Sequence, residues 1–361
     1  MSKFRNIPLP PRLIYGRGSL NQLDCVLSSH RKNSNSPFIY ILDHCLKHKK
    51  KISEKLPLDG NDLILYADTT LEPKTKQVDD IRDRLKSTFR DSISGIIGIG
   101  GGSVLDIAKA VALMLTNQGS SADYQGWDLI QNPAIYKVGI PTLSGTGAEV
   151  SRTCVLMGPE KKLGINSDHT PFDQIILDPD LIADVPREQR FYTGMDCYIH
   201  CIESLNGSYI NAFSRAHGEK ALALCREVFL DCEDWNPECD EKLMMASYLG
   251  GISIATSQVG VVHALSYGLS YLLGIKHGEG NCIVLDHIEK YYPEGYAEFQ
   301  LMLEKNNIQL RKNICKDLGD KDFETMSKVA LGLEPLWENA LGKNWKDEIN
   351  PLVLKKIYQE I

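Results

Sequence analysis

Four residues in the C-terminal half of the chain have side chains that could together bind a divalent metal. Asp196 and His200 lie four residues apart in a segment whose pattern predicts a helix, so both side chains project from one face. His263 and His277 follow, fourteen residues apart. One carboxylate and three imidazoles are a donor set for a divalent transition metal and need no thiolate. A helical histidine is also often a hydrogen-bonded core residue, and the spacing alone leaves both interpretations open.

A glycine-rich turn could bind the phosphates of a nucleotide. The segment 98–103, Gly-Ile-Gly-Gly-Gly-Ser, follows an apolar run typical of a buried strand and precedes a helical segment. Glycines let the backbone approach a ligand closely, and the N–H groups that begin a helix attract an anion. Ser103 and Asp106 match a capping box, which predicts that the helix begins next to Ser103. The spacing fits neither the Rossmann nor the Walker pattern, so a tight turn without a ligand is the alternative.

A second small-residue turn, Pro-Thr-Leu-Ser-Gly-Thr-Gly at 141–147, follows another predicted strand. Two such turns at adjacent strand ends suit a dinucleotide that lies across the carboxyl edge of a parallel sheet. Asp43 ends an earlier strand, where its carboxylate could accept hydrogen bonds from adenosine ribose hydroxyls and would repel a 2′-phosphate. This arrangement favours NAD over NADP, whereas a cap or turn role for Asp43 is the alternative.

The elements that must position these residues form two predicted domains. In residues 1–185, continuous apolar runs alternate with helical segments, as in a parallel α/β sheet covered on both faces. In residues 186–361 helical periodicity dominates, which predicts an all-helical domain. The strands are predicted at 38–42, 62–66, 95–99, 138–140 and 175–177, and the helices at 75–89, 104–115, 212–229 and 241–254.

Composition excludes several classes of protein. The chain has 361 residues and a formal net charge of −7, which is not the charge of a general nucleic-acid binder. It has no apolar run of about 18 residues and no signal-peptide pattern at its N-terminus, so we expect no membrane partner. The ten cysteines include no C-x-x-C pair and predict reduced thiols in the cytoplasm. Cys197 and Cys201 are interpreted as small core residues.

Taken together, these segments resemble the metal-dependent alcohol dehydrogenase family that is called iron-containing or group III. The resemblance implies a dehydroquinate-synthase-like fold, with an α/β dinucleotide-binding domain followed by an all-α domain. It also implies NAD and one divalent metal, Fe²⁺ or Zn²⁺, as cofactors, and a homodimer. The motifs that carry the resemblance are Gly100-Gly101-Gly102-Ser103-x-x-Asp106-x-x-Lys109, Pro141-Thr142-x-x-Gly145-Thr146-x-x-Glu149, Asp178-Pro179, Gly194-x-Asp196-x3-His200-x-x-Glu203 and His263-x13-His277-Gly278.

The resemblance also implies roles for individual residues. The metal ligands would be Asp196, His200, His263 and His277. The residues that contact the cofactor would be Asp43, Gly100, Gly101, Gly102, Ser103, Asp106, Thr142, Leu143, Thr146, Val155 and Lys162, with the pyrophosphate on 101–103 and the nicotinamide near the last two.

Two departures from the family pattern fall in the region expected to form the substrate pocket. Many members have a second histidine four residues after the position of His263, where this chain has Tyr267, which could pass or donate a proton. Arg152 occupies a position that is often uncharged and could bind a substrate carboxylate in a bidentate pair. A surface ion pair is the alternative for Arg152.

Within the family, the chain looks most like a member that oxidises the terminal primary alcohol of an eight-carbon acid sugar to an aldehyde. We therefore expect a small acid sugar or another primary alcohol as the substrate. Three alternatives remain open: a short-chain alcohol or aldehyde oxidoreductase of the same family, a dehydroquinate-synthase-like lyase, and a non-catalytic nucleotide-binding module.

Overall fold

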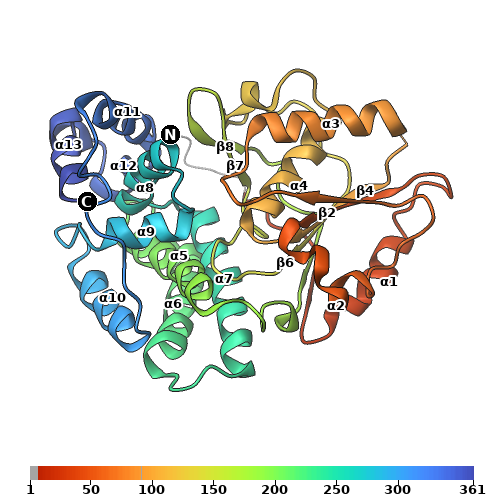
Figure 1. Ribbon diagram of the computed structural model, residues 1–361, viewed down its shortest axis with the longest axis horizontal. Helices are drawn as coiled ribbons and strands as arrows, with labels where there is room; N and C mark the ends of the chain where they lie inside the picture. Colours follow the sequence, from red (N-terminus) through yellow and green to blue (C-terminus); the bar gives the residue numbers. More distant parts are fainter. Residues whose placement is uncertain (1–6, 91) are drawn as a thin grey trace. The chain divides into compact units, whose positions relative to one another are not determined.

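The chain divides into two compact units in the computed structural model, which describes residues 7–90 and 92–361 (Figure 1). The first unit consists of Met1–Leu143 and Ala148–Asp184, and the second of Ser144–Gly147 and Val185–Ile361. The named strands all belong to the first unit, and the second is helical. An α/β unit followed by an all-α unit confirms the predicted fold class. The Ser144–Gly147 segment, which lies with the helical unit, was not anticipated.

A six-stranded parallel sheet forms the centre of the first unit, in the order β1-β9-β6-β4-β2-β3. Each predicted strand agrees with the observed one to within one residue at either end, because buried parallel strands leave continuous apolar runs in the sequence. The edge strand β1 was not predicted. The strands are β1 (Leu13–Tyr15), β2 (Phe38–Asp43), β3 (Leu63–Ala67), β4 (Gly95–Gly100), β6 (Lys137–Pro141) and β9 (Gln174–Leu177).

Helices cover both faces of this sheet. Phe38, Tyr40 and Leu42 of β2 belong to a buried cluster with side chains of α1 (Leu23–Ser28) and α2 (Lys50–Ser53). The opposite face carries α4 (Gly102–Met114), with α3 (Thr75–Phe89) beside it (Figure 1). A Cβ on Gly98 would lie 2.7 Å from Cβ of Ala108, so a glycine in β4 is what lets α4 pack this closely.

A second, three-stranded sheet in the order β5-β8-β7 was not predicted. Its strands are short: β5 (Gly126–Trp127), β7 (Thr153–Met157) and β8 (Lys162–Asn166). β7 and β8 pair antiparallel, and β5 joins β8 in parallel. Val155 and Lys162, both expected near the cofactor, lie on this sheet.

Nine α-helices are described in the second unit, and three of them carry the predicted metal ligands. The helix predicted at 212–229 ends at Arg226 and continues as the π-helical segment η5 (Glu227–Asp231). Cys197 and Cys201 are fully buried in α5, which confirms their assignment to the core. The helices are α5 (Arg187–Asn206), α6 (Ala212–Arg226), α7 (Pro237–Thr256), α8 (Val261–Leu273), α9 (His277–Leu285), α10 (Pro293–Lys305), α11 (Asp320–Leu331), α12 (Glu334–Leu341) and α13 (Pro351–Glu360).

Among the described residues, no single helix is long and apolar enough to cross a membrane. The consecutive helices α7 and α8 meet that length and composition test only as a pair, and a bend of 101° separates them. Most residues of both helices are buried against other parts of the chain.

Candidate metal centre and dinucleotide site

Three helices of the second unit bring the predicted ligands together. Asp196 and His200 lie one turn apart on α5. His263 is in the first turn of α8, and His277 is the first residue of α9. Gly274 ends α8 with φ of +67°, a left-handed conformation that turns the chain into α9 and explains the spacing of the two histidines.

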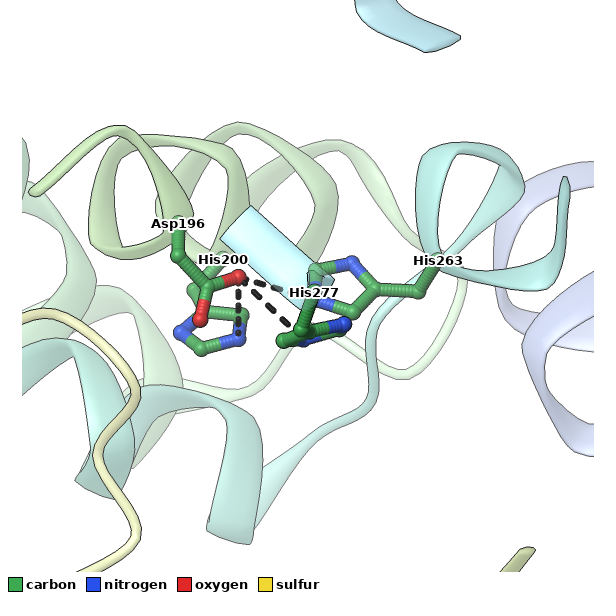
Figure 2. A group of neighbouring side chains, drawn as sticks. All are labelled: Asp196, His200, His263 and His277. Carbon is green, nitrogen blue, oxygen red and sulfur yellow. Dashed lines mark ion pairs between the residues drawn. The ribbon is translucent and has the colours of Figure 1, made fainter. Parts of the chain in front are cut away.

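The four side chains converge on one point (Figure 2). Oδ1 of Asp196 lies 3.4, 3.3 and 3.5 Å from the Nε2 atoms of His200, His263 and His277. The first three residues are buried, whereas the side chain of His277 is 26% exposed. We call these four residues the metal centre; His277 marks the side on which solvent reaches it.

The donor set fits a divalent cation in both spacing and charge. Atoms about 2.1 Å from one ion in tetrahedral geometry lie about 3.4 Å from one another, close to the observed separations. Asp196 and Glu203 are 1% exposed, and two buried carboxylates require compensating positive charge. No residue in the described part of the chain hydrogen-bonds to Oδ2 of Asp196 or Nδ1 of His200. These features fit a divalent cation better than they fit a self-contained hydrogen-bond network.

The charge states of the metal centre also indicate a place for a cation. Burial lowers the pKa of His200 to about 4, despite the nearby Asp196, so this imidazole is neutral at pH 7. Burial opposes the charged form of His263 as well, but Glu203 and Asp196 outweigh it and raise the pKa of His263 to about 9. Burial likewise opposes ionisation of Asp196, yet His200 and His277 hold its pKa below the usual value. Without a metal, His263 thus keeps the proton whose positive charge a bound cation would otherwise supply.

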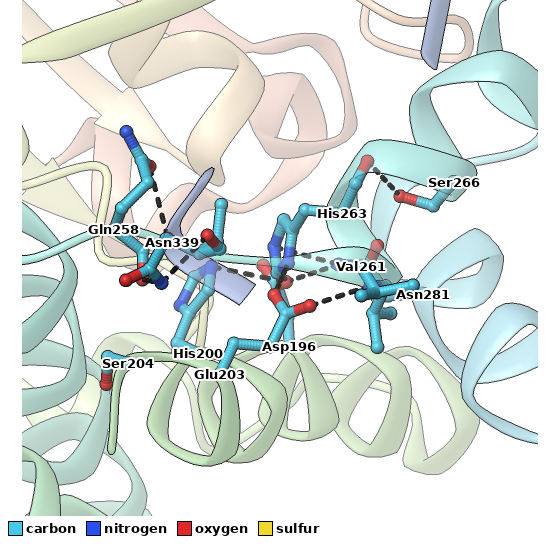
Figure 3. Close-up of polar contacts among 12 residues, drawn as sticks. Asp196, His200, Glu203, Ser204, Gln258, Val261, His263, Ser266, Asn281 and Asn339 are labelled. Carbon is cyan, nitrogen blue, oxygen red and sulfur yellow. Dashed lines mark hydrogen bonds and ion pairs between the residues drawn. The ribbon is translucent and has the colours of Figure 1, made fainter. Parts of the chain in front are cut away.

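Glu203 orients His263, a role that sequence reasoning did not assign. Its Oε2 lies 2.5 Å from Nδ1 of His263 (Figure 3). Its Oε1 accepts a 2.7 Å hydrogen bond from the N–H of Val262. This contact engages Nδ1 and leaves Nε2 facing the metal centre. The sequence contained a signal, since Glu203 lies three residues after His200 on the same helix.

Asn281 is a second residue that the sequence analysis missed. It lies one turn after His277 on α9, and its Nδ2 is 2.7 Å from Oδ1 of Asp196. The same atom is 3.2 Å from Nε2 of His263 and 3.4 Å from Nε2 of His277. The amide therefore lies among the atoms expected to hold the metal.

Tyr267 lies beside the metal centre, as its position in α8 requires. Its ring meets the ring of His277 edge-on, with centroids 5.7 Å apart and an interplanar angle of 70°. The residue is only partly buried. Its role in proton transfer stays a prediction.

In the first unit, the glycine-rich turn joins β4 to α4. Gly101 is the N-cap and α4 begins at Gly102, so the first amides of the helix have no partner within it. A Cβ on Gly101 would lie 2.8 Å from Cδ1 of Leu143, and one on Gly100 would lie 2.6 Å from Cβ of Val104. The turn therefore leaves no room for a side chain at either glycine, and Leu143 of the second turn lies against it.

The capping box predicted from Ser103 and Asp106 is wrong, because the helix begins earlier than expected. Asp106 instead accepts a 2.9 Å hydrogen bond from the N–H of Val155 and forms a 3.1 Å ion pair with Lys109. Val155 lies in β7, and Lys109 hydrogen-bonds to carbonyls of β7 and of the segment before it, so Asp106 and Lys109 attach this part of the chain to α4. For Asp106 and Val155 the structure thus shows a contact with each other, and their roles toward a cofactor stay predictions.

The two turns and Asp43 share one edge of the sheet. The strands β2, β4 and β6 are neighbours, and Thr142 donates its N–H to the carbonyl of Gly100 over 2.9 Å. Asp43 accepts hydrogen bonds from the N–H of Cys45 at 3.0 Å and from Oγ1 of Thr69 at 2.8 Å. It therefore caps the short helix η2 (His44–His48) while lying at the edge where a dinucleotide is predicted.

The remaining predicted site residues are Thr146, Lys162 and Arg152, and each lies in a different setting. Thr146 belongs to the Ser144–Gly147 segment of the second unit. Lys162 is buried, and its Nζ lies 3.0 Å from Oε2 of Glu72. Nη2 of Arg152 lies 2.5 Å from Asp128 and 2.8 Å from Asp168, so the structure has the ion pairs that were the alternative for this residue. A substrate carboxylate would have to compete with two carboxylates of the protein.

Two family descriptions match the chain. Residues 10–179 match "Iron-containing alcohol dehydrogenase", and residues 190–343 match "Fe-containing alcohol dehydrogenase family, C-terminal". The two matches meet near the division between the structural units. They also agree with the resemblance drawn from the motifs.

Individual proteins that are similar to this chain also include alcohol and aldehyde oxidoreductases. The chain is 32% identical to the sulfoacetaldehyde reductase of Bilophila wadsworthia (strain 3_1_6), over 64% of this chain and 60% of that protein. It is 29% identical to alcohol dehydrogenase 4 of Schizosaccharomyces pombe (strain 972 / ATCC 24843), over 59% of this chain and 52% of that one. These alignments thus span half to three-fifths of the two relatives. The crystal structure of sulfoacetaldehyde reductase from Bifidobacterium kashiwanohense in complex with NAD+ superposes with a TM-score of 0.81 and 20% identity, over 99% of this chain and 98% of that one, which shows the shared fold.

Proposed function

The chain belongs to the iron-containing alcohol dehydrogenase family, and we propose that it interconverts a primary alcohol and an aldehyde, with NAD as the hydride carrier. The observation that carries this proposal is the metal centre, whose four donor atoms lie within 4.8 Å of one another. Members of this family use NAD and a divalent metal. Both family descriptions name alcohol dehydrogenases, which argues against a lyase and against a non-catalytic module.

The residues of the centre suit this chemistry. When bound there, a divalent cation supplies Lewis-acid polarisation of an alcohol oxygen. Glu203 keeps His263 oriented, and the partly exposed His277 leaves one side of the centre open to substrate. Tyr267 lies on that side, and we propose that its hydroxyl exchanges a proton with the substrate or with water. Because an Asp–His₃ set binds Zn²⁺ more tightly than Fe²⁺, purified protein can contain zinc even where iron is the working metal.

For the substrate, we propose 3-deoxy-α-D-manno-octulosonate (Kdo), oxidised at its C8 alcohol. The aldehyde product would feed the synthesis of an 8-amino sugar for lipopolysaccharide, and the enzyme would be a Kdo 8-oxidase. The support is the resemblance of the whole chain together with Tyr267 and Arg152. Because Arg152 binds Asp128 and Asp168, binding of the substrate carboxylate by this residue would require exchange of one ion pair.

A second candidate substrate is a short anionic aldehyde. The specific observation is the 32% identity to a protein named sulfoacetaldehyde reductase. The two candidates share an anionic group and a primary alcohol or aldehyde, and differ in chain length. Short uncharged alcohols, such as 1-propanol, are the third class to compare.

We further propose a cytoplasmic homodimer, which size-exclusion chromatography with light scattering would test.

Steady-state kinetics on the metal-loaded protein test these proposals. NADH formation is followed with Kdo and with 1-propanol, and NADH consumption with sulfoacetaldehyde, with chelated protein as the control. A kcat/KM for Kdo at least about tenfold above that for 1-propanol supports the acid-sugar assignment, and faster turnover of propanol overturns it. The highest kcat/KM with sulfoacetaldehyde establishes the second candidate. No turnover of nicotinamide with any alcohol or aldehyde contradicts the proposed activity itself.

A further inference from the structure

Two cysteines of the second unit lie in direct contact, away from the residues assigned so far. Cys232 follows η5, and Cys239 lies in the first turn of α7. Their Sγ atoms are 2.6 Å apart, only about half an ångström more than the ~2.05 Å of a disulfide bond. Cys232 is partly exposed, whereas Cys239 is 4% exposed. A small oxidant can therefore reach one sulfur of a pair that is already close to bonding distance.

The loop between the two cysteines is fixed by other contacts. Asn236 caps α7 by accepting hydrogen bonds from the N–H groups of Glu238 and Cys239, at 2.9 and 3.3 Å. Trp235 donates its indole N–H to Oδ1 of Asp240 over 2.8 Å. The guanidinium of Arg190 lies 4.0 Å from the centre of the Trp235 ring. These contacts hold the sulfurs together without a covalent link, so bond formation needs little rearrangement.

The other cysteines differ from this pair in access or in partners. Cys25 and Cys45 are exposed, and they are the thiols that a solution reagent reaches first. Cys197 contacts both Cys201 and Cys225, but all three are fully buried. The pair Cys232 and Cys239 thus combines a contact between two sulfur atoms with exposure of one of them, Cys232, to solvent.

We propose that Cys232 and Cys239 form a reversible disulfide by exchange with a low-molecular-weight disulfide such as oxidised glutathione. The Cys232 thiolate attacks the disulfide and releases one glutathione thiolate, which leaves a mixed disulfide. The Cys239 thiolate then attacks the Cys232 sulfur and releases the second. Two S–H bonds are lost, one protein S–S bond forms, and one glutathione disulfide is reduced to two thiols. Burial, with the hydrogen bond to Cys239, raises the pKa of Cys232 to about 11, so the exchange accelerates as the pH rises toward that value.

The disulfide would restrain a segment that packs against α5, the helix that carries Asp196 and His200. Phe229 lies 6.3 Å from Trp235 and 5.6 Å from Phe191, measured between ring centroids. The Phe229 ring also packs on Gly194, two residues before Asp196, where a Cβ would lie 2.4 Å from Cζ of the ring. Closing the eight-residue loop should raise Tm by about 3 °C, because it removes entropy from the unfolded chain.

Peptide mass spectrometry tests the proposal on the full-length protein. The protein is incubated with oxidised glutathione at pH 8.5, remaining thiols are alkylated, and trypsin digestion is done without reductant. The peptide 227–242 contains both cysteines and has no internal Lys or Arg. We expect it to be unalkylated and two hydrogen atoms lighter than the dithiol, and to return to the dithiol form with dithiothreitol. We expect Cys232→Ser to lose this species and the Tm increase.

Cys25 and Cys45 serve as internal controls, since their modification by glutathione shows that the reagent was active. The proposal is overturned if they react while the peptide 227–242 is recovered with both thiols alkylated. It is equally overturned if that peptide carries glutathione without closing to the internal disulfide.

Discussion

Oε2 of Glu203 lies 2.5 Å from Nδ1 of His263, and both side chains are almost fully buried. The other oxygen of this carboxylate accepts the N–H of Val262, so the glutamate is fixed by the same helix whose histidine it orients. A carboxylate behind a ligating imidazole sets its tautomer and strengthens it as a donor. We therefore propose that Glu203 would position His263 for a bound metal.

Replacing this carboxylate should weaken metal binding without abolishing the fold. We expect Glu203→Gln to lower metal affinity by about 10- to 100-fold, because a neutral amide holds the His263 ring less firmly. Competition with a chromophoric chelator measures the change. Glu219→Gln, on the exposed face of α6, is the matched control and should bind metal like the wild type. Equal metal affinities for the two variants would contradict a positioning role for Glu203.

The charge of Asp43 should determine the choice between NAD and NADP. Asp43→Asn keeps an oxygen for the N–H of Cys45 but removes the charge that repels a 2′-phosphate. We expect the preference for NAD, as a ratio of kcat/KM values, to fall by about tenfold. Asp68→Asn, just beyond the end of β3, is the control and should leave the ratio unchanged. If Asp43→Asn leaves it unchanged too, Asp43 acts only as a cap.

Gly145 should tolerate no side chain. It has φ of +148°, and a Cβ there would lie 1.6 Å from the carbonyl oxygen of Thr193, three residues before Asp196. We expect Gly145→Ala to lower the free energy of unfolding by about 3 kcal/mol or more. Gly274→Ala is the control, since Gly274 also has positive φ but has open space around it, and should cost about 1 kcal/mol. Similar urea midpoints for the two variants would show that the close approach at Thr193 has no energetic weight.

Lys109 should be a major source of stability in the first unit. Its buried Nζ donates to the carbonyls of Ala148 and Thr153 and lies 3.1 Å from Oδ1 of Asp106. We expect Lys109→Met to lower the free energy of unfolding by about 3–5 kcal/mol, because it leaves the Asp106 carboxylate without its positively charged partner. Removing that carboxylate as well, in Lys109→Met/Asp106→Leu, should restore part of the loss in a denaturant titration. A double variant that is less stable by the sum of the single losses would contradict a coupled pair.

The sequence was most informative where structure depends on local pattern. The apolar runs of β2, β4 and β6 predicted a parallel sheet, and the i, i+4 spacing of Asp196 and His200 predicted a shared helix face, because both signals lie within one element. The small sheet of β5, β7 and β8 was missed because β5 has only two residues and pairs with β8, almost forty residues later in the chain.

Contacts between distant segments account for the remaining differences. Glu203 and Asn281 lie one turn after His200 and His277, but their contacts with His263 and Asp196 are made across helices. Spacing along the chain therefore indicates the helix face of these two residues without encoding the contacts. The capping box at Ser103 failed because Asp106 hydrogen-bonds to β7, almost fifty residues later, instead of to its own helix start. Arg152 was expected near substrate since its carboxylate partners, Asp128 and Asp168, could not be identified before the fold brought them together.

Elemental analysis of one variant shows whether Asp196, His200, His263 and His277 bind a metal ion. His277→Ala is the variant of choice, because His277 is the most exposed ligand and its loss should least disturb the core. His217→Ala on α6 is the control. We expect about one metal ion per chain in the wild type and in His217→Ala. We expect less than about a tenth of that in His277→Ala, with loss of NAD-linked alcohol oxidation and an unchanged circular dichroism spectrum. A His277→Ala protein that keeps its metal and its activity would contradict the assignment of the centre.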